Sequence, residues 1–352
     1  MSFQAGWDAV NLKMPHKIPR TEFSLEYSYD ILAAITGREV NAANPQSVDA
    51  AIKAAYQSWD YDIRLSLLIY KEIFGNKMTN MGHAEFESNG RDFDDDVHCL
   101  FDNVEDVLNF DPMAEYGEVN QQELKHRFEQ HYRDNVAFYP DCVNMTGIYP
   151  SLITGLTYIF GWEMLLEAAG TDSEAFGALT NRYAGWMQQY YDALALADVP
   201  VIYSHDDMVW TEGAIFSPAW YKKYVFPNLK KYWAPLKKSG KKVLFVCDGN
   251  YTQFAEEIAA CGNDGFWFEI FTDLAYMTKT FGQTHFLVGN ADTRVLLSGS
   301  PADIEREVRR CLDLGRACPG YFMAVSNHIP PNTPVDSALY YNEVYMKLRG
   351  RD

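Results

Sequence analysis

The sequence predicts an α/β protein built as one closed (β/α)8 barrel, and three observations predict it. Apolar segments of strand length alternate with amphipathic helices, most regularly in the second half of the chain. Each strand segment is apolar at nearly every position, as in parallel strands that are buried on both faces. No glycine-rich phosphate-binding loop follows them, so a closed barrel is favoured over a doubly wound sheet.

The barrel needs eight strands, and the chain offers eight candidates in order. They are 17–24, 64–70, 142–148, 200–207, 241–250, 264–270, 284–292 and 321–331. Helices between the later strands carry capping residues at their ends. Ser217 precedes Pro218, Gly240 ends that helix, and Ser300 with Pro301 begins another. The predicted helices are 217–240, 251–263, 274–282 and 300–320.

The first half of the chain is less regular. The mostly helical segment 151–195 is expected to wrap the barrel, and residues from about 80 to 140 to form an insertion or lid. No repeat or linker divides the chain, so we expect a single domain over 1–352.

Composition excludes some functions. A formal net charge of -18 argues against nucleic-acid binding, because a phosphate backbone is bound by clustered Lys and Arg. No apolar run is long enough to span a membrane, and the N-terminus lacks the apolar core of a signal peptide. The six cysteines are irregularly spaced. We therefore expect a cytoplasmic protein with reduced thiols; the oligomeric state stays open, with a homodimer as one option.

Chemistry in such barrels takes place at the C-terminal ends of the strands. The polar residues expected there are His205, Asp206, Asp207, Cys247, Asp248, Glu269, Asn290, Asp292, Asn327 and His328. A thiolate, a carboxylate and an imidazole together suit zinc, which predicts Cys247, Glu269 and His328 as a metal site. The alternative for Cys247 is a small residue of the core. The alternative for His328 is a structural hydrogen bond to a loop carbonyl.

Three residues in a row, His205, Asp206 and Asp207, are the catalytic candidates. An aspartate in an apolar site has a raised pKa and can act as a general acid. Since neighbours on a strand face opposite sides, only one of the two aspartates is expected to point into the barrel mouth. A solvated loop is the alternative for the pair.

The segments "GNADTRVLLSGSPADIEREVRRCLD" and "HIPPNTPVDSALYYNEVY" resemble the C-terminal part of the uroporphyrinogen decarboxylase superfamily. That superfamily includes zinc-dependent, corrinoid-coupled methyltransferases, and the resemblance implies a single (β/α)8 barrel. The decarboxylases carry an arginine-rich N-terminal motif close to "FMRQAGRY" that holds substrate carboxylates. The corresponding region here reads "KIPRTEFSLEYSYD".

The methyltransferase branch places His-x-Cys at the end of one strand and a further Cys near the last. Here Phe245 stands at the His position, Cys247 is kept, and "SNHIPP" replaces the second Cys. The 22 positions from Cys247 to Glu269 are similar to the spacing at the zinc site of cobalamin-independent methionine synthase. "KIPRTEFS", "TNMGHAEF" and "HDDMVWTEGAIFSP" look most like aryl-ether O-demethylases of the veratrol and vanillate type.

The resemblance implies a zinc enzyme that moves the methyl group of a methoxylated aromatic to the Co(I) corrinoid of a partner protein. The residues expected to bind that aromatic substrate are Tyr149, Trp210, Trp267, Phe268, Asn290 and Asn327. Trp267 and Phe268 are neighbours, so they cannot both face the site. A tetrapyrrole decarboxylase and an inert corrinoid- or small-molecule-binding barrel are the alternative functions.

Overall fold

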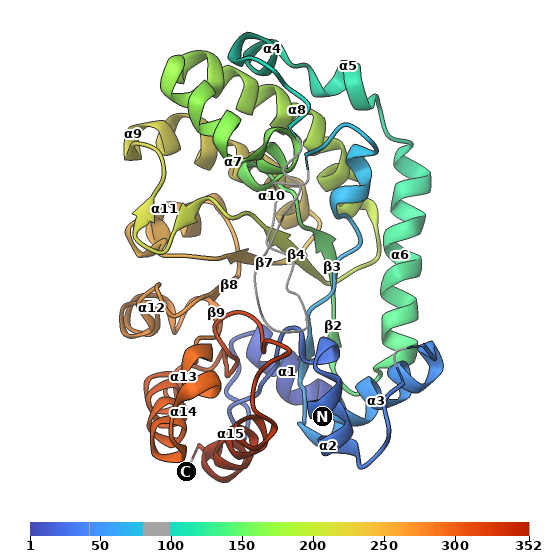
Figure 1. Cartoon of the computed structure of the whole chain (residues 1–352), viewed down its shortest axis with the longest axis vertical. Helices are drawn as coiled ribbons and strands as arrows, with labels where there is room; N and C mark the ends of the chain where they lie inside the picture. Colours follow the sequence, from blue (N-terminus) through green and yellow to red (C-terminus); the bar gives the residue numbers. More distant parts are fainter. Residues whose placement is uncertain (42, 80–98, 352) are drawn as a thin grey trace.

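The main sheet is parallel, and its strands lie side by side in the order in which they follow one another along the chain (Figure 1). The computed structural model describes residues 1–41, 43–79 and 99–351. Its parallel strands are β1 (Ile63–Arg64), β2 (Val143–Asn144), β3 (Thr146–Ile148), β4 (Val201–His205), β7 (Lys242–Cys247), β8 (Gly265–Phe268), β9 (Phe286–Val288) and β10 (Tyr321–Phe322). A small antiparallel hairpin, β5 (Val209–Trp210) and β6 (Gly213–Ala214), follows β4.

Backbone hydrogen bonds complete the ring through the first predicted strand, 17–24. The Met323 N–H donates to the Pro19 carbonyl at 2.8 Å, and Thr21 N–H donates back to Met323 at 3.1 Å. On the other side Asp62 N–H donates to the Arg20 carbonyl at 2.9 Å. These bonds join the last strand to the first and the first to the second, as a (β/α)8 barrel requires.

Helices surround the strands (Figure 1). They are α1 (Phe3–Val10), α2 (Tyr29–Thr36), α3 (Pro45–Ser58), α4 (Val104–Asn109), α5 (Pro112–Tyr116), α6 (Gln121–Phe138), α7 (Ile153–Thr171), α8 (Ser173–Leu196), α9 (Pro218–Trp220), α10 (Phe226–Lys238), α11 (Ala255–Cys261), α12 (Leu274–Phe281), α13 (Thr293–Ser298), α14 (Pro301–Gly315) and α15 (Val335–Leu348). The predicted caps are confirmed: Ser217 accepts from Trp220 N–H, and Ser300 forms a capping box with Asp303.

Two layers of core divide the strand side chains. The inner core fills the barrel and includes Tyr203, Val246 and Trp267. The outer core lies between strands and helices and includes Phe245 and Phe268. Trp267 and Phe268 therefore lie on opposite faces of β8, as the alternation of a strand requires.

Helix α1 covers the N-terminal end of the barrel, and it was not predicted. Its Ala9 and Val10 belong to the inner core together with Val143. Gly6 packs so closely that an added Cβ would lie 2.1 Å from the Asp62 carbonyl oxygen. The opposite, C-terminal end of the strands is thus left as the mouth.

Part of the predicted insertion, residues 80–98, lies outside the described residues. The described remainder holds α4, α5 and α6, and α6 connects the second barrel strand to the third. Helix α6 packs against α8, while α4 packs against α7. None of the helices in the described ranges is both long and apolar enough to cross a membrane.

A buried ion pair lies where the ring closes. Arg20 donates to Glu22, and both side chains are fully buried. The other Glu22 oxygen accepts from Val325 N–H at 2.7 Å, which ties the first strand to the last. The Arg20 guanidinium also lies over the rings of Trp59 and Tyr345, at 4.8 and 4.4 Å from their centroids.

Replacing Arg20 by Met should destabilise the protein by about 3–5 kcal/mol, because it leaves the Glu22 carboxylate buried and unpaired. Urea denaturation measures the loss. Arg306→Met, on the exposed face of α14, is the matched control and should change stability by less than about 0.5 kcal/mol. Adding Glu22→Gln should recover part of the loss, since it removes the unpaired charge. Equal stability of the Arg20 and Arg306 variants would contradict this role.

Candidate active site

A cavity of about 370 Å³ opens at the barrel mouth. It is lined by residues at the ends of the first three barrel strands or just after them, by Tyr203 of β4, and by His328 beyond β10. Its aromatic lining consists of Phe23, Tyr27, Tyr70, Tyr149 and Tyr203. Arg64 is the one lysine or arginine among the described lining residues. The cavity therefore offers a large contact surface to a flat apolar ring and little positive charge to a polyanion.

His205, at the end of β4, lies against the aromatic wall. Its ring stacks on Tyr149, with centroids 3.8 Å apart and an angle of 11° between the planes. Tyr203, two positions earlier on the same strand face, is parallel to it at 6.3 Å. The stack fixes the orientation of the imidazole beside the cavity.

The imidazole of His205 lies within hydrogen-bond distance of Asp207. His205 Nδ1 lies 3.1 Å from the Tyr149 carbonyl oxygen, which can only accept, so Nδ1 carries a hydrogen. His205 Nε2 lies 3.0 Å from Asp207 Oδ1, and this contact needs a second proton, on the ring or on the carboxyl. The Asp207 side chain remains 13% exposed. The pair can therefore hold a proton at the mouth and release it to a bound molecule.

Two more carboxyl groups join Asp207 at the mouth. Asp207 Oδ1 also accepts from Asp248 N–H at 3.0 Å. Asn327 Nδ2 bridges the other two, at 2.9 Å from Asp248 Oδ2 and 2.8 Å from Glu269 Oε1. Glu269 Oε2 accepts from Gly249 N–H at 2.7 Å. Asn327, predicted to bind substrate, thus holds the acidic cluster together.

The acidic cluster favours protonated forms. Burial, followed by the charges of Asp207 and Glu269, raises the pKa of Asp248 well above its ordinary value. Burial also raises the pKa of Glu269, against the hydrogen bonds from Asn327 and Gly249. Neighbouring carboxylates cannot all be charged cheaply in an apolar site, so these two groups release their protons at a higher pH than free carboxyl groups do.

Asp206 points the other way, into the layer between β4 and the helices. Its Oδ1 accepts from Leu152 N–H at 3.1 Å and from Thr154 N–H at 2.9 Å, at the start of α7. Its Oδ2 makes no hydrogen bond in the described part of the chain. The prediction that only one of the two aspartates faces the mouth is confirmed, and Asp207 is that residue; Asp206 fixes the helix.

The structure does not bring the predicted zinc ligands together. Cys247 belongs to the outer core and its thiol donates to the Asp248 carbonyl at 3.2 Å, because β7 turns Val246 inward and Cys247 outward. His328 contacts Ser24 and lies against Phe23. Among residues 1–41, 43–79 and 99–351, no group of three or more His, Cys, Asp or Glu side chains could hold a metal ion. The donor set predicted for zinc therefore does not fit, and Cys247 is a core residue.

Of the remaining predicted substrate contacts, one lines the cavity and the others do not. Tyr149 lines the cavity. Trp210 lies on the β5–β6 hairpin, is 53% exposed and faces Trp162 rather than the cavity. Asn290 is buried and donates to the Glu269 and Thr272 carbonyls at 3.0 Å, which is a structural role. Trp267 lies inside the barrel and Phe268 outside it.

Sequence reasoning left several site residues out. Tyr203 could have been found by alternation, since it shares the inward face with His205. Asp248 was noted at its strand end but given no role. Phe23 lies near the end of the segment 17–24 and Tyr70 ends the segment 64–70, yet no pattern marked either as a cavity residue. Arg64 carries no sequence signal at all.

The fold and this mouth define a barrel protein with an acidic, aromatic-lined site at the C-terminal strand ends. Residues 115–345 match the profile of the uroporphyrinogen decarboxylase (URO-D) family, and the chain belongs to that family. It is 27% identical over 187 residues to the uroporphyrinogen decarboxylase of Geobacter sulfurreducens, which is 53% of each chain. It is 29% identical over 177 residues to that of Carboxydothermus hydrogenoformans, 50% of this chain and 48% of the relative. The chain thus spans about half the length of the curated relatives it matches.

A solved structure, a methyltransferase from Methanosarcina mazei, superposes over 99% of both chains with a TM-score of 0.63. The two sequences are 16% identical, so this similarity concerns the fold. It extends over the whole barrel, including the first strand, which the family profile does not reach.

The position of Asp206 predicts a pH effect on stability. Burial raises the pKa of Asp206 to about 7, whereas an unfolded aspartate titrates near about 3.9. Between these two pH values the folded state therefore binds more protons than the unfolded state. The contribution of Asp206 to the free energy of unfolding is complete below about pH 4 and is lost as the pH rises toward about 7.

Asp206→Asn should make the free energy of unfolding depend less on pH. The amide oxygen can still accept both helix N–H groups, and the side chain can no longer ionise. Urea unfolding of the variant and the parent from pH 4 to pH 8 measures it. Asp206→Ala should instead cost about 1–3 kcal/mol near pH 4, since two buried donors lose their acceptor, and this cost should shrink as the pH rises because the variant also has nothing to ionise. A steeper pH dependence in Asp206→Asn than in the parent would contradict the assignment.

Proposed function

We propose that this protein transfers the methyl group of a methoxylated aromatic to the Co(I) corrinoid of a partner protein, leaving a phenol. The observation that carries the proposal is the adjacency of an aromatic-lined cavity and the hydrogen-bonded His205–Asp207 pair. Membership of the URO-D family is compatible with this function, and the methyl-transfer step is our inference beyond the family.

The cavity supports an aromatic substrate. Tyr70 meets Tyr149 edge to face at 4.7 Å, and Tyr149 continues the stack to His205. A ring bound against Tyr149 would have aromatic faces and edges on several sides, each contact contributing about 0.5–1.5 kcal/mol. The Tyr70 side chain is held before binding, since its hydroxyl accepts from that of Tyr158 at 2.9 Å.

The acid pair supports the difficult part of the reaction. When the bond between the ether oxygen and the methyl carbon breaks, its electron pair stays on oxygen, and a phenolate leaves poorly unless it is neutralised. His205 and Asp207 would deliver the proton to that oxygen, and the Asn327-bridged acids would replace it. The corrinoid would supply the nucleophile that takes the methyl group. No step is assigned to zinc, because the predicted donors do not converge.

A tetrapyrrole decarboxylase is the second candidate, favoured by the names of the curated relatives. A porphyrinogen with several carboxylates calls for several cations. The described cavity lining offers Arg64, whose guanidinium already donates to Asn135 at 2.7 Å and lies over Tyr139. Asp207, Asp248 and Glu269 at the same mouth supply no positive charge to such a substrate in either protonation state.

The test uses 2-methoxyphenol with free cob(I)alamin as methyl acceptor, and uroporphyrinogen III in a parallel reaction. We expect catechol and methylcobalamin in equal amounts and no change in the porphyrinogen. Carbon dioxide release from uroporphyrinogen would overturn the proposal in favour of the decarboxylase. Binding of 2-methoxyphenol that Tyr149→Leu abolishes, with no methyl transfer, would overturn the enzymatic part and leave a small-molecule-binding barrel.

The two neighbouring aspartates give a matched pair for the acid. Asp207→Asn should lower the turnover of methyl transfer by about 10²–10⁴, because the amide cannot release a proton to the leaving oxygen. The affinity for 2-methoxyphenol should change little. Asp206→Asn, one residue away and facing the helices, should keep most of its turnover. Equal turnover of both variants and the parent would contradict the role of Asp207.

A further inference from the structure

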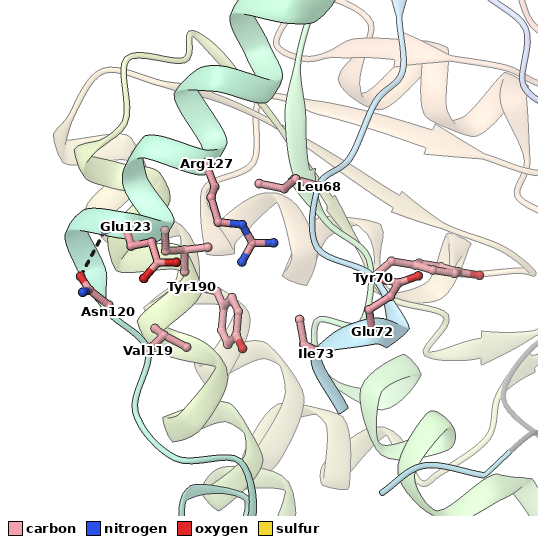
Figure 2. A pocket seen from close by; sticks show the side chains of 10 residues that line it. Leu68, Tyr70, Glu72, Ile73, Val119, Asn120, Glu123, Arg127 and Tyr190 are labelled. Carbon is pink, nitrogen blue, oxygen red and sulfur yellow. Dashed lines mark hydrogen bonds between the residues drawn. The ribbon is translucent and has the colours of Figure 1, made fainter. Parts of the chain in front are cut away.

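A second cavity, of about 530 Å³, lies outside the barrel between α6, α8 and the short 3-10 helix η2 (Lys71–Phe74). Figure 2 shows it from close by, with the side chains of Arg127, Glu123 and Tyr190 on one side and Glu72 on the other. Tyr70 lines both this cavity and the one at the mouth, so the two are neighbours with different linings. Its size falls within the range of small-molecule sites.

The walls of this second cavity are held in place by hydrogen bonds. Val119 N–H donates to Gln189 Oε1 at 2.9 Å, and Gln121 Nε2 donates to the Gln189 carbonyl at 3.0 Å. Asn120 caps α6 by accepting from two N–H groups, which fixes the first turn that carries Glu123. The start of α6 is thus fixed to α8 by bonds within the protein, and this wall of the cavity is preformed.

The charged groups of the second cavity have both signs. Glu123 and Arg127 are four residues apart on α6, so they project from the same face of the helix. Glu72 adds a second carboxylate from η2. Burial raises the pKa of Tyr190 to about 12, so its hydroxyl is protonated and can donate. The Arg127 guanidinium thus shares the cavity with carboxylates, and Figure 2 shows the Tyr190 hydroxyl pointing away from it.

We propose that this second cavity binds a small zwitterion that has an apolar body. The ligand's carboxylate would meet Arg127, and its ammonium group would meet Glu123 or Glu72. The apolar body would lie on the remaining wall, which is formed by Leu68, Ile73, Val119 and Leu124. A simple anion would face two carboxylates and a simple cation would face the arginine, so neither satisfies the lining as a zwitterion does.

Calorimetric titration of the full chain with three related probes tests the proposal. They are L-phenylalanine, 3-phenylpropanoate, which lacks the ammonium group, and 2-phenylethylamine, which lacks the carboxylate. We expect L-phenylalanine to bind at least about tenfold more tightly than either of the others, since each lacks one charge-assisted contact. Equal affinity for 3-phenylpropanoate, or no binding of L-phenylalanine, would overturn the proposal.

Variants locate the binding site. Arg127→Met should weaken L-phenylalanine binding by about tenfold or more, while 2-phenylethylamine binding should not fall. Arg133→Met, on the same helix but paired with Glu129, is the matched control and should bind like the parent. Tyr149→Leu, at the barrel mouth, should also bind L-phenylalanine normally. Loss of binding in Tyr149→Leu with retention in Arg127→Met would place the ligand at the mouth and overturn the proposal, whatever the outcome of the methyl-transfer test.

Discussion

Side chains along each barrel strand point alternately into the barrel and out toward the helices, and this alternation decides which groups can reach the mouth. At the end of β4 and just beyond it, the alternation turns His205 and Asp207 inward and Asp206 outward to the start of α7. On β7 it turns Val246 inward and Cys247 into the helix layer. The same rule therefore builds the acidic cluster and removes the thiol from it. A shift of one residue in either strand would exchange these roles.

The acidic cluster is tolerable because each carboxyl group has a donor. Asp207 accepts from Asp248 N–H, Glu269 accepts from Gly249 N–H, and Asn327 donates to both Asp248 and Glu269. Protonation removes the remaining repulsion, since burial raises the pKa values of Asp248 and Glu269. A site that stores protons beside an aromatic wall is suited to supplying one to a poor leaving group. The same site has little positive charge to bind a substrate that carries many negative charges.

Much of the fold could be predicted from the sequence because parallel strands and capped helices have strong local signals. The later strands and the helices that begin after Ser217 and Ser300 were predicted correctly. Helix α1 was not predicted, because a short amphipathic segment becomes a helix here through packing on the barrel floor. The zinc site was predicted from residue types at the strand ends and from a Cys247-to-Glu269 spacing similar to that of another zinc site. A strand buried on both faces shows no apolar–polar alternation, so nothing in "KVLFVC" told which way Cys247 pointed.

The central claim is that an aromatic ether binds against Tyr149 with its oxygen within reach of the His205–Asp207 pair. A crystal structure of the protein with 2-methoxyphenol tests it most directly. The account predicts the ring in the mouth cavity, stacked on or edge-on to the tyrosines, with the ether oxygen within about 2.6–3.2 Å of the acid pair. A ring bound outside that cavity, or an ether oxygen turned toward Arg64 and away from Asp207, would contradict it.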